Sequence, residues 1–373
     1  MTSFDNAQTL TFNVGPHHSA AIGPLRMKVR TDGEMVVSCE PDVGYLHRGI
    51  EKLAERMTWT GFMPYTDRVD YLSAIHCNLA YALAVESLAG IAVPERAQTI
   101  RVLVGELNRL GSHLLAVGHL ANQLGAETAL MYALRDRERI NNLFEMLCGA
   151  RLTYSYVRIG GVAADVTEGF IEKTYEFVEY LMPKLKEYHD LLSNNRVFMG
   201  RLAHVGVISP ATAIDCGLTG PTLRASGVKY DTRKMQPYSG YQKFDFDVPV
   251  GKGEVGAVGD AFDRYIVRMR ELEQAVSIIK QALDALPEGQ FSTALPRLFK
   301  APKGEAYAAV ESPRGTLGVY VSSSGEKNPA RVKFRTPSFA ALNLFPDLFK
   351  NIPLSDVGTI VGSLDIMVSE VDR

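Results

Sequence analysis

The segment from Gly44 to Tyr71 holds the residues of this chain that are best suited to contact a reactive ligand. It reads GYLHRGIEKLAERMTWTGFMPYTDRVDY and places Arg48 and Arg68 among aromatic residues, ending on the tyrosine. A phenol hydroxyl donates a hydrogen bond, and its ordinary pKa of about 10 keeps it protonated at neutral pH. The segment therefore offers fixed positive charge beside a neutral proton donor.

The same residues also have a purely structural interpretation. Buried charges are normally paired, so both arginines could bind a carboxylate close by in the sequence, namely Asp67, Asp70 or Glu51. The tyrosine could be a core residue. The residue types alone leave these alternatives open.

A second group of polar residues lies in the turn at 15–19, Gly-Pro-His-His-Ser. His17 and His18 supply at most half of a zinc site, and no Cys or Asp follows at a recognisable spacing. They are either polar turn residues or part of a ligand pocket. His113 and His119 fall on one expected helix, too far round it to share a face, and are expected to be ordinary bundle or surface histidines.

Hydrophobic periodicity indicates which elements position these residues. Strands are expected at 8–14 and 25–39, and alternation at 305–335 indicates further strands. Apolar spacing at i, i+3 and i+4 predicts helices at 72–90, 99–124, 128–157, 167–195 and 262–286, with Pro183 expected to kink the fourth. The Gly- and Pro-rich stretch 205–250 reads as a long ordered loop, a length that usually has a binding role.

The predicted fold class is α+β and mostly helical, with a central bundle of long helices flanked by small β elements. We treat 1–373 as one domain. It would comprise an N-terminal β region at 1–40, a helical bundle at 72–290 with a loop insertion at 205–250, and a C-terminal β and tail region at 305–373.

Composition excludes several classes of protein. The net charge of −2 does not suit nucleic-acid binding. The most apolar window, 72–91, carries His76, Asn78 and Glu86, so no membrane span is expected. The N-terminus has neither the basic nor the apolar region of a secretory signal, and the four cysteines are far apart in the sequence. These features predict a chain made and kept in the cytosol.

Three pieces of sequence carry a resemblance to a known family: the turn at 15–19, the segment 44–71 and the terminal GSLDIMVSEVDR. Together they resemble the D-subunit family of the proton-pumping NADH–quinone oxidoreductases, respiratory complex I. That family descends from the large subunit of nickel–iron hydrogenases and forms part of a quinone pocket. The resemblance covers nearly the whole chain. It implies the hydrogenase-large-subunit-like fold.

The resemblance also tests for a metal centre. Hydrogenases hold nickel and iron through two C-x-x-C pairs, one near each end of the chain. The corresponding regions here are 46–49, Leu-His-Arg-Gly, and 364–369, Leu-Asp-Ile-Met-Val-Ser, and neither contains a cysteine. Because thiolate is the ligand that these metals require, we expect no metal in this chain and no hydrogenase activity.

The resemblance implies a quinone site with one donor for each carbonyl oxygen. Tyr71 matches the family's catalytic tyrosine. The family's second donor is the histidine that closes the turn G-P-x-H-P-x-x-H-G; here His18 is kept, but Ile22 replaces the closing histidine before Gly23. The aspartate that pairs with this histidine is replaced by Gln123. Both halves of the His–Asp pair have changed together, so the proton route must differ. His18, a backbone N–H or water could meet the second oxygen.

In the family, arginines matching Arg48 and Arg68 lie against the terminal iron–sulfur cluster of a neighbouring small subunit. Positive charge there stabilises the reduced cluster. Thr153 stands where the family has a titratable histidine on this path. The aromatic run 59–65 is expected to face the same small subunit.

The implied function is that of a complex I component that is inactive alone and binds no cofactor itself, with quinone as substrate. Expected partners are a B-type iron–sulfur small subunit, a C-type subunit and an H-type membrane subunit, with the chain on the cytoplasmic side of the cell membrane. Menaquinone or a phenazine could replace the usual quinone. The alternatives are a related membrane-bound oxidoreductase with another donor, such as ferredoxin or deazaflavin, and a hydrogenase-derived scaffold without substrate.

Overall fold

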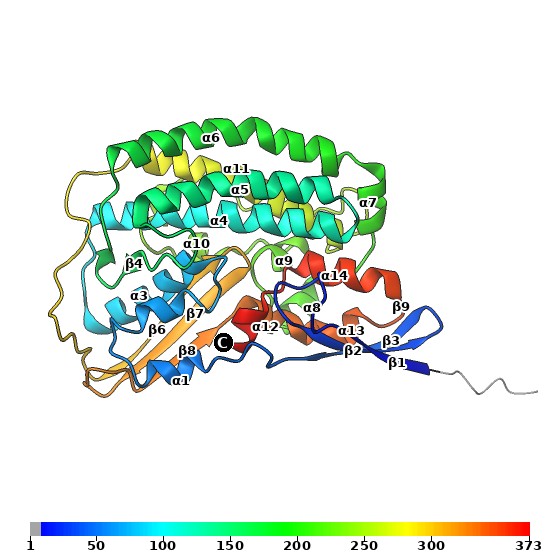
Figure 1. Cartoon of the computed structure of the whole chain (residues 1–373), viewed down its shortest axis with the longest axis horizontal. Coiled ribbons are helices and arrows are strands. Elements are labelled where there is room, and N and C mark those ends of the chain that lie inside the picture. The colour runs from blue at the N-terminus through cyan, green and yellow to red at the C-terminus, as the bar shows by residue number, and fades with distance from the viewer. Residues whose placement is uncertain (1–8) are drawn as a thin grey trace, which may run out of the picture.

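The structure is a computed structural model and describes residues 9–373. Long helices lie side by side along one side of the molecule, and two small sheets with short helices lie along the other (Figure 1). The C-terminus lies between the two sheets rather than at an outer edge (Figure 1). This mixed, mostly helical architecture confirms the predicted fold class.

The bundle consists of α4 (Glu95–Gln123), α5 (Glu127–Cys148), α6 (Glu168–Tyr188) and α11 (Ala261–Asp284). Side-chain caps fix two of the starts: Thr167 accepts a hydrogen bond from the Phe170 N–H, and Asp260 accepts one from the Asp263 N–H. The short buried helix α3 (Ala74–Ala89) was also predicted correctly. No helix within residues 9–373 combines the length and the apolar character needed to cross a bilayer.

The predicted helix 128–157 is too long at its C-terminal end. Gly149 adopts a left-handed conformation (φ 72°) and terminates α5 directly after Cys148. The chain then forms a small ribbon of β4 (Val157–Arg158) and β5 (Gly161–Val162). The predicted helix 167–195 continues through Pro183 to Tyr188 and ends in the π-helical turn η1 (His189–Ser193).

Two antiparallel sheets confirm the strand predictions. The first has the order β1-β2-β3-β9 and comprises β1 (Thr9–Val14), β2 (Arg26–Asp32), β3 (Met35–Asp42) and β9 (Ile352–Pro353). The second has the order β6-β7-β8 and comprises β6 (Gly304–Ser312), β7 (Gly315–Ser323) and β8 (Arg331–Arg335). The two sheets lie below opposite ends of the bundle (Figure 1).

Short helices complete the fold. Near the N-terminus these are α1 (Ile50–Ala54) and α2 (Met63–Thr66), and α7 (Arg196–Leu202) follows η1. The C-terminal group comprises α12 (Pro337–Ala341), η3 (Leu342–Leu344), α13 (Phe345–Leu348), η4 (Leu354–Asp356), α14 (Val357–Leu364) and α15 (Val368–Asp372). Of these helices, α7 lies at one end of the bundle, and α14 packs against α4 and α11 (Figure 1).

The stretch 205–250 is more structured than the predicted loop. It contains α8 (Pro210–Asp215), α9 (Gly220–Ala225), α10 (Thr232–Met235) and the 3₁₀ turn η2 (Tyr241–Lys243). These helices are too short to show a 3.6-residue hydrophobic period, which explains why the sequence pattern did not indicate them. Proline within the first turn helps to start α8 and α9.

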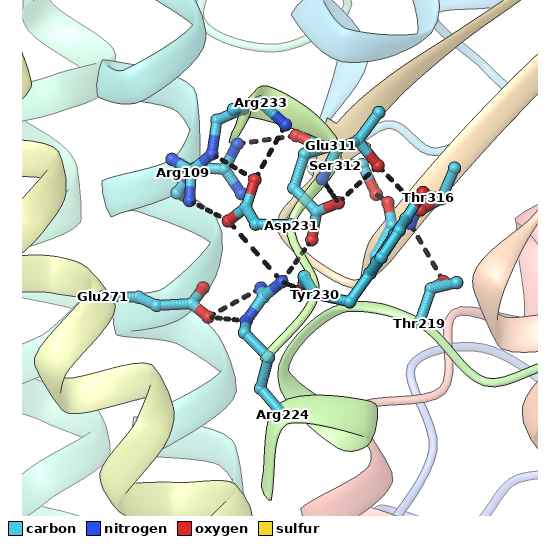
Figure 2. A network of polar contacts seen from close by, with 12 residues as sticks. Arg109, Thr219, Arg224, Tyr230, Asp231, Arg233, Glu271, Glu311, Ser312 and Thr316 are labelled. Atoms are coloured by element: carbon cyan, nitrogen blue, oxygen red, sulfur yellow. Dashed lines mark hydrogen bonds and ion pairs between the residues drawn. The ribbon is translucent and has the colours of Figure 1, made fainter. Parts of the chain in front are cut away.

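A network of buried ions attaches this stretch to the bundle (Figure 2). Arg224 of α9 donates from Nε to Glu271 of α11 (2.8 Å) and from Nη1 to Glu311 of β6 (2.7 Å). Arg233 of α10 binds Asp231 at 2.7 Å. All five side chains are at most 1% exposed. Because buried charges are costly unless they are paired, the network fixes α9, α10, α11 and β6 relative to one another.

Replacing Glu311 by alanine should destabilise the chain by about 3–5 kcal/mol, because the Arg224 charge would stay buried with fewer partners. Glu254→Ala is the matched control, since its ion pair with Arg270 lies at the surface and should contribute about 1 kcal/mol or less. Urea unfolding of both variants measures the difference. Equal losses of stability would contradict a structural role for the buried network.

Candidate functional site

The turn at 15–23 and the C-terminal tail, far apart in the sequence, pair with each other. The Ile22 N–H donates to the Ile366 carbonyl (3.1 Å), and the Val368 N–H donates to the Ile22 carbonyl (3.0 Å). Gly23 follows with φ 109°, and a Cβ there would lie 3.0 Å from Val368 Cβ and 3.2 Å from Leu46 Cδ1. Glycine is therefore required for both backbone conformation and close packing.

The loop 44–48 is fixed to the same tail. Both carboxylate oxygens of Asp372 accept backbone N–H groups, from Gly44 at 2.8 Å and from Leu46 at 2.7 Å. The Arg48 N–H donates to the Arg373 carbonyl at 3.1 Å. The structure thus brings together the three pieces of sequence that carried the family resemblance, including both regions that would hold metal in a hydrogenase.

Tyr71 lies beside this junction, directly before α3. Its side chain is partly buried, and no residue from 9 to 373 hydrogen-bonds to its hydroxyl. Burial raises the pKa of Tyr71, and the charge of Asp70 raises it further, while Arg314 and Arg48 act in the opposite direction. The phenol is therefore a neutral donor with a free hydroxyl and two cations close enough to stabilise a phenolate.

Asp70 orients this part of the chain. Its Oδ1 accepts the N–H groups of Leu72 (3.0 Å) and Ser73 (3.3 Å), which organises the start of α3. Its Oδ2 binds Arg314 Nη1 at 2.7 Å, and the same guanidinium donates from Nε to the Asp365 carbonyl at 3.1 Å. Sequence reasoning missed Arg314 and Asp365. The sequence did offer one indication of Arg314, because it lies in a Pro-Arg-Gly turn between two apolar strands.

The two family arginines occupy different environments. Arg48 is half-buried and donates to the backbone carbonyls of Leu46 (3.2 Å) and Ser369 (2.9 Å); burial lowers its pKa. Arg68 has a side chain 47% exposed and lies 3.7 Å from the fully buried Asp67.

The simple ion-pair interpretation is therefore wrong for Arg48, which binds carbonyl oxygens in place of a nearby carboxylate. Of the other two carboxylates considered, Asp70 binds Arg314, and Glu51 lies among Arg331, Lys333 and Arg373. Only the loose contact between Arg68 and Asp67 fits the expectation.

The structure also places His18, which lies in the turn, and Gln123, which is the last residue of α4. His18 Nδ1 accepts the Ala20 N–H (3.1 Å), so the proton of the neutral ring is on Nε2. Gln123 Nε2 donates to the Ser19 carbonyl at 2.5 Å, and the Ser19 hydroxyl approaches Gln123 Oε1 at 3.4 Å. Gln123 thus holds the turn in position instead of contributing a charge.

Two histidines of α4 have separate roles. His119 is largely buried beneath the backbone of Ser19 and Ala20, and burial lowers its pKa while Asp365 acts in the opposite direction. His113 binds Glu271 at 2.9 Å and so belongs to the buried ion network, as the bundle interpretation expected.

The structure corrects one expectation about the partner surface. Trp59, Phe62 and Met63 are each at most 1% exposed and pack in the chain's own core. Trp59 Nε1 donates to the Glu326 carbonyl at 3.1 Å. The aromatic run 59–65 therefore does not present these side chains to a partner, because they cover the β6-β7-β8 side of the core.

Thr153 lies in the loop after α5 with φ 55°, an unusual conformation for a β-branched residue, and its hydroxyl donates to the Leu152 carbonyl. Across residues 9–373, no three His, Cys, Asp or Glu side chains gather in a metal-binding arrangement. The absence of nickel stays a prediction.

The fold and these converging segments define a hydrogenase-like large subunit without the thiolate ligands, and comparison with known proteins gives the family. The chain belongs to the family described as "Respiratory-chain NADH dehydrogenase, 49 Kd subunit", which matches residues 123–299 and 293–373. The D subunit of the NADH-quinone oxidoreductase of Desulforamulus reducens is 49% identical over 96% of this chain and 97% of its own length. The proteins of the same name from Bacillus cereus and Bacillus thuringiensis are each 47% identical over 98% of this chain and 99% of theirs. The resemblance inferred from the sequence is confirmed.

Asp67 yields a test of the site's electrostatics. Neither of its carboxylate oxygens has a hydrogen-bond partner, and burial raises its pKa to about 7. The folded chain therefore holds a proton at pH values where the unfolded chain, with a pKa of about 3.9, has lost it.

Relative to Asp67→Asn, the wild-type chain should lose stability as pH rises from about 4 to about 7, by up to about 4 kcal/mol. Urea unfolding at pH 5 and pH 8 measures this loss. Asp245→Asn, at an exposed carboxylate, is the control and should leave the pH dependence unchanged. A constant difference between Asp67→Asn and wild type at the two pH values would show that this carboxyl does not titrate as described.

Proposed function

We propose that this chain acts as the D subunit of a proton-translocating NADH–quinone oxidoreductase and forms one wall of its quinone-reduction pocket. Family membership supports the assignment to the complex. The observation that supports the pocket is the meeting of the turn 15–23, the loop 44–48 and the tail 364–373 beside Tyr71. A substrate wall built from three distant segments needs this kind of mutual fixation.

Tyr71 is the proposed donor to one quinone oxygen. As the quinone gains electrons, negative charge develops on its carbonyl oxygens, and a positioned phenol can transfer a proton to one of them. Partial burial keeps the phenol protonated before the reaction, and Arg48 and Arg314 favour the phenolate that remains afterwards. The same environment therefore suits both states of the side chain.

His18 is the proposed partner for the second oxygen. Ile22 has no side-chain donor, and its backbone N–H is already bonded to Ile366. The Nδ1 atom of His18 is occupied by the Ala20 N–H, so Nε2 carries the proton that can be donated. Gln123 supports this arrangement by holding the Ser19 carbonyl.

The electrons would come from the iron–sulfur cluster of a neighbouring subunit, against which Arg48 and Arg68 are proposed to lie. The exposed Arg68 suits an interface position, whereas Arg48 would act from within the wall. The proposed neighbours are the B-type, C-type and H-type subunits, with the complex at the cytoplasmic side of the cell membrane.

The two alternative functions require different features of this chain. An oxidoreductase fed by ferredoxin or deazaflavin would use the same quinone wall with another electron-input module. A scaffold without substrate would not need an unbonded, partly buried phenol next to two cations, and this observation favours an active pocket.

In the assembled complex, Tyr71→Phe should reduce quinone reductase activity by roughly 10²–10⁴-fold, because a positioned proton donor is lost while the ring stays in place. Electron transfer from NADH to an artificial acceptor upstream of the quinone should remain. The assay compares the two activities in the same membranes.

Two variants sharpen this test. Tyr175→Phe removes a hydroxyl that binds Asp284 at the surface of the bundle, far along the chain from the site, and should leave both activities unchanged. Ile22→His introduces a second side chain that can donate, and should partly restore activity in the Tyr71→Phe background. Quinone reduction by Tyr71→Phe within about twofold of wild type would overturn the assignment of Tyr71.

Arg68→Ala should lower the midpoint potential of the neighbouring cluster, since a positive charge that stabilises the reduced form is removed. Redox titration of the assembled complex measures the shift, with Arg270→Ala as a control because that arginine pairs with Glu254 on the surface of α11. An unchanged potential in Arg68→Ala would place this side chain away from the cluster.

A further inference from the structure

Gly358 lies where helix α14 meets the turn that holds His18 (Figure 1). It is the second residue of α14, and its φ is not positive, so the backbone conformation here does not require glycine. Glycine also favours a helix less than alanine does, by up to about 1 kcal/mol. The reason for a glycine at this position must therefore lie in what surrounds it.

Two side chains of the proposed site occupy the space next to Gly358. A Cβ at this position would lie 3.8 Å from His18 Cε1 and 3.7 Å from Gln123 Oε1. Both are ordinary van der Waals distances, so a methyl group fits, whereas a larger group must displace the ring or the amide. His18 belongs to the turn and Gln123 to α4, so three elements meet at this glycine.

The imidazole of His18 is held on two sides. Its Nδ1 accepts the Ala20 N–H at 3.1 Å, and its Cε1 faces Gly358. Cε1 is the ring atom between the two nitrogens, so support at this atom, together with the bond to Nδ1, fixes the direction of Nε2. Within residues 9–373 that nitrogen has no hydrogen-bond partner and is not a fully buried atom. It is the polar atom of the ring that stays available to a ligand.

Gln123 gives a second route from position 358 to the same imidazole. Its Nε2 donates to the Ser19 carbonyl at 2.5 Å, while its Oε1 faces Gly358. Ser19 directly follows His18 in the turn. A bulkier residue at 358 would therefore press on the ring itself and, through the amide, on the backbone that carries the ring.

We propose that Gly358 is a positioning residue for quinone reduction, which leaves the space beside α14 that His18 needs to direct its Nε2–H at the second quinone oxygen. This inference rests on the proposed function, in which His18 is the donor to that oxygen. Gly358 acts through His18 and Gln123 and needs no contact with the quinone. Because a displacement of about 1 Å can cost about 10²-fold in rate, a few added atoms behind the ring should have a large effect.

The test is a series of increasing side-chain size at position 358 in the assembled complex. Gly358→Ala adds only the methyl group that fits and should lower the rate of quinone reduction by no more than about twofold. Gly358→Val adds two branches beyond Cβ, and at least one of them must displace the ring or the amide. It should lower kcat by about tenfold or more with the quinone KM little changed, because a misplaced proton donor acts mainly on the transition state.

Two controls exclude poor assembly and a general effect of valine in a helix. Electron transfer from NADH to an artificial acceptor in the same membranes normalises the rates, since incomplete assembly lowers both activities together. Gly169→Val is the matched variant, because Gly169 is the second residue of α6 and a Cβ there would meet nothing within 4 Å. It should leave quinone reduction unchanged.

A double-mutant cycle with His18 separates positioning from damage to the fold. In a His18→Ala background there is no imidazole to misplace, so Gly358→Val should cause less than about twofold further loss. General damage would instead add its full effect in both backgrounds. If Gly358→Val does not assemble, Gly358→Thr has the same shape, suits this half-buried position and should give the same result.

Three results would overturn the positioning role. They are quinone reduction by the branched variants within about twofold of wild type, an equal further loss from Gly358→Val with and without the imidazole, and unimpaired quinone reduction by His18→Ala. If Tyr71→Phe is still severely impaired, any of these results would leave the proposed function intact and remove only the role of Gly358.

Discussion

The arrangement around the site depends on the buried guanidinium of Arg314. It binds Asp70 just before α3, Asp365 just after α14 and, more loosely, the Ser112 hydroxyl of α4 at 3.5 Å. A buried cation must keep its partners, because their removal leaves an uncompensated charge. The turn between β6 and β7 therefore fixes the residue before Tyr71 and the start of the C-terminal tail at the same time. The position of Tyr71 relative to the tail follows from this one contact.

In the related hydrogenases, cysteines from both ends of the chain bind the same metal centre, and the metal joins these two regions. In this chain the C-terminal tail joins them instead. Here backbone pairing between Ile22 and the tail, and the acceptance of two N–H groups by Asp372, join the same regions. These bonds need no particular ligand and leave a polar junction beside Tyr71. The junction thus keeps its shape without a metal, and in the proposed pocket proton transfer would depend on Tyr71 and His18.

The sequence predicted the long helices and the strands because their hydrophobic periods extend over many residues. The prediction was wrong at 149–157, where Gly149 terminates the helix. It also missed the short helices within 205–250, which buried ion pairs hold in place and which hydrophobic periodicity does not reveal. The proposed site residues Tyr71 and His18 came from local motifs together with the family resemblance. Arg314 and Asp365 were missed, because their partners are distant in sequence and only the folded chain brings them together. The same limit explains why Trp59 was placed at a partner surface although it lies in the core.

The central claim is that the wall beside Tyr71 binds the quinone head group. The most direct measurement is an electron cryomicroscopy structure of the assembled complex with a bound short-chain quinone. We predict one quinone oxygen within about 3 Å of the Tyr71 hydroxyl, with the ring lying against the turn 15–23 and the tail 364–373. A head group bound elsewhere, with the Tyr71 hydroxyl facing only protein, would contradict this claim.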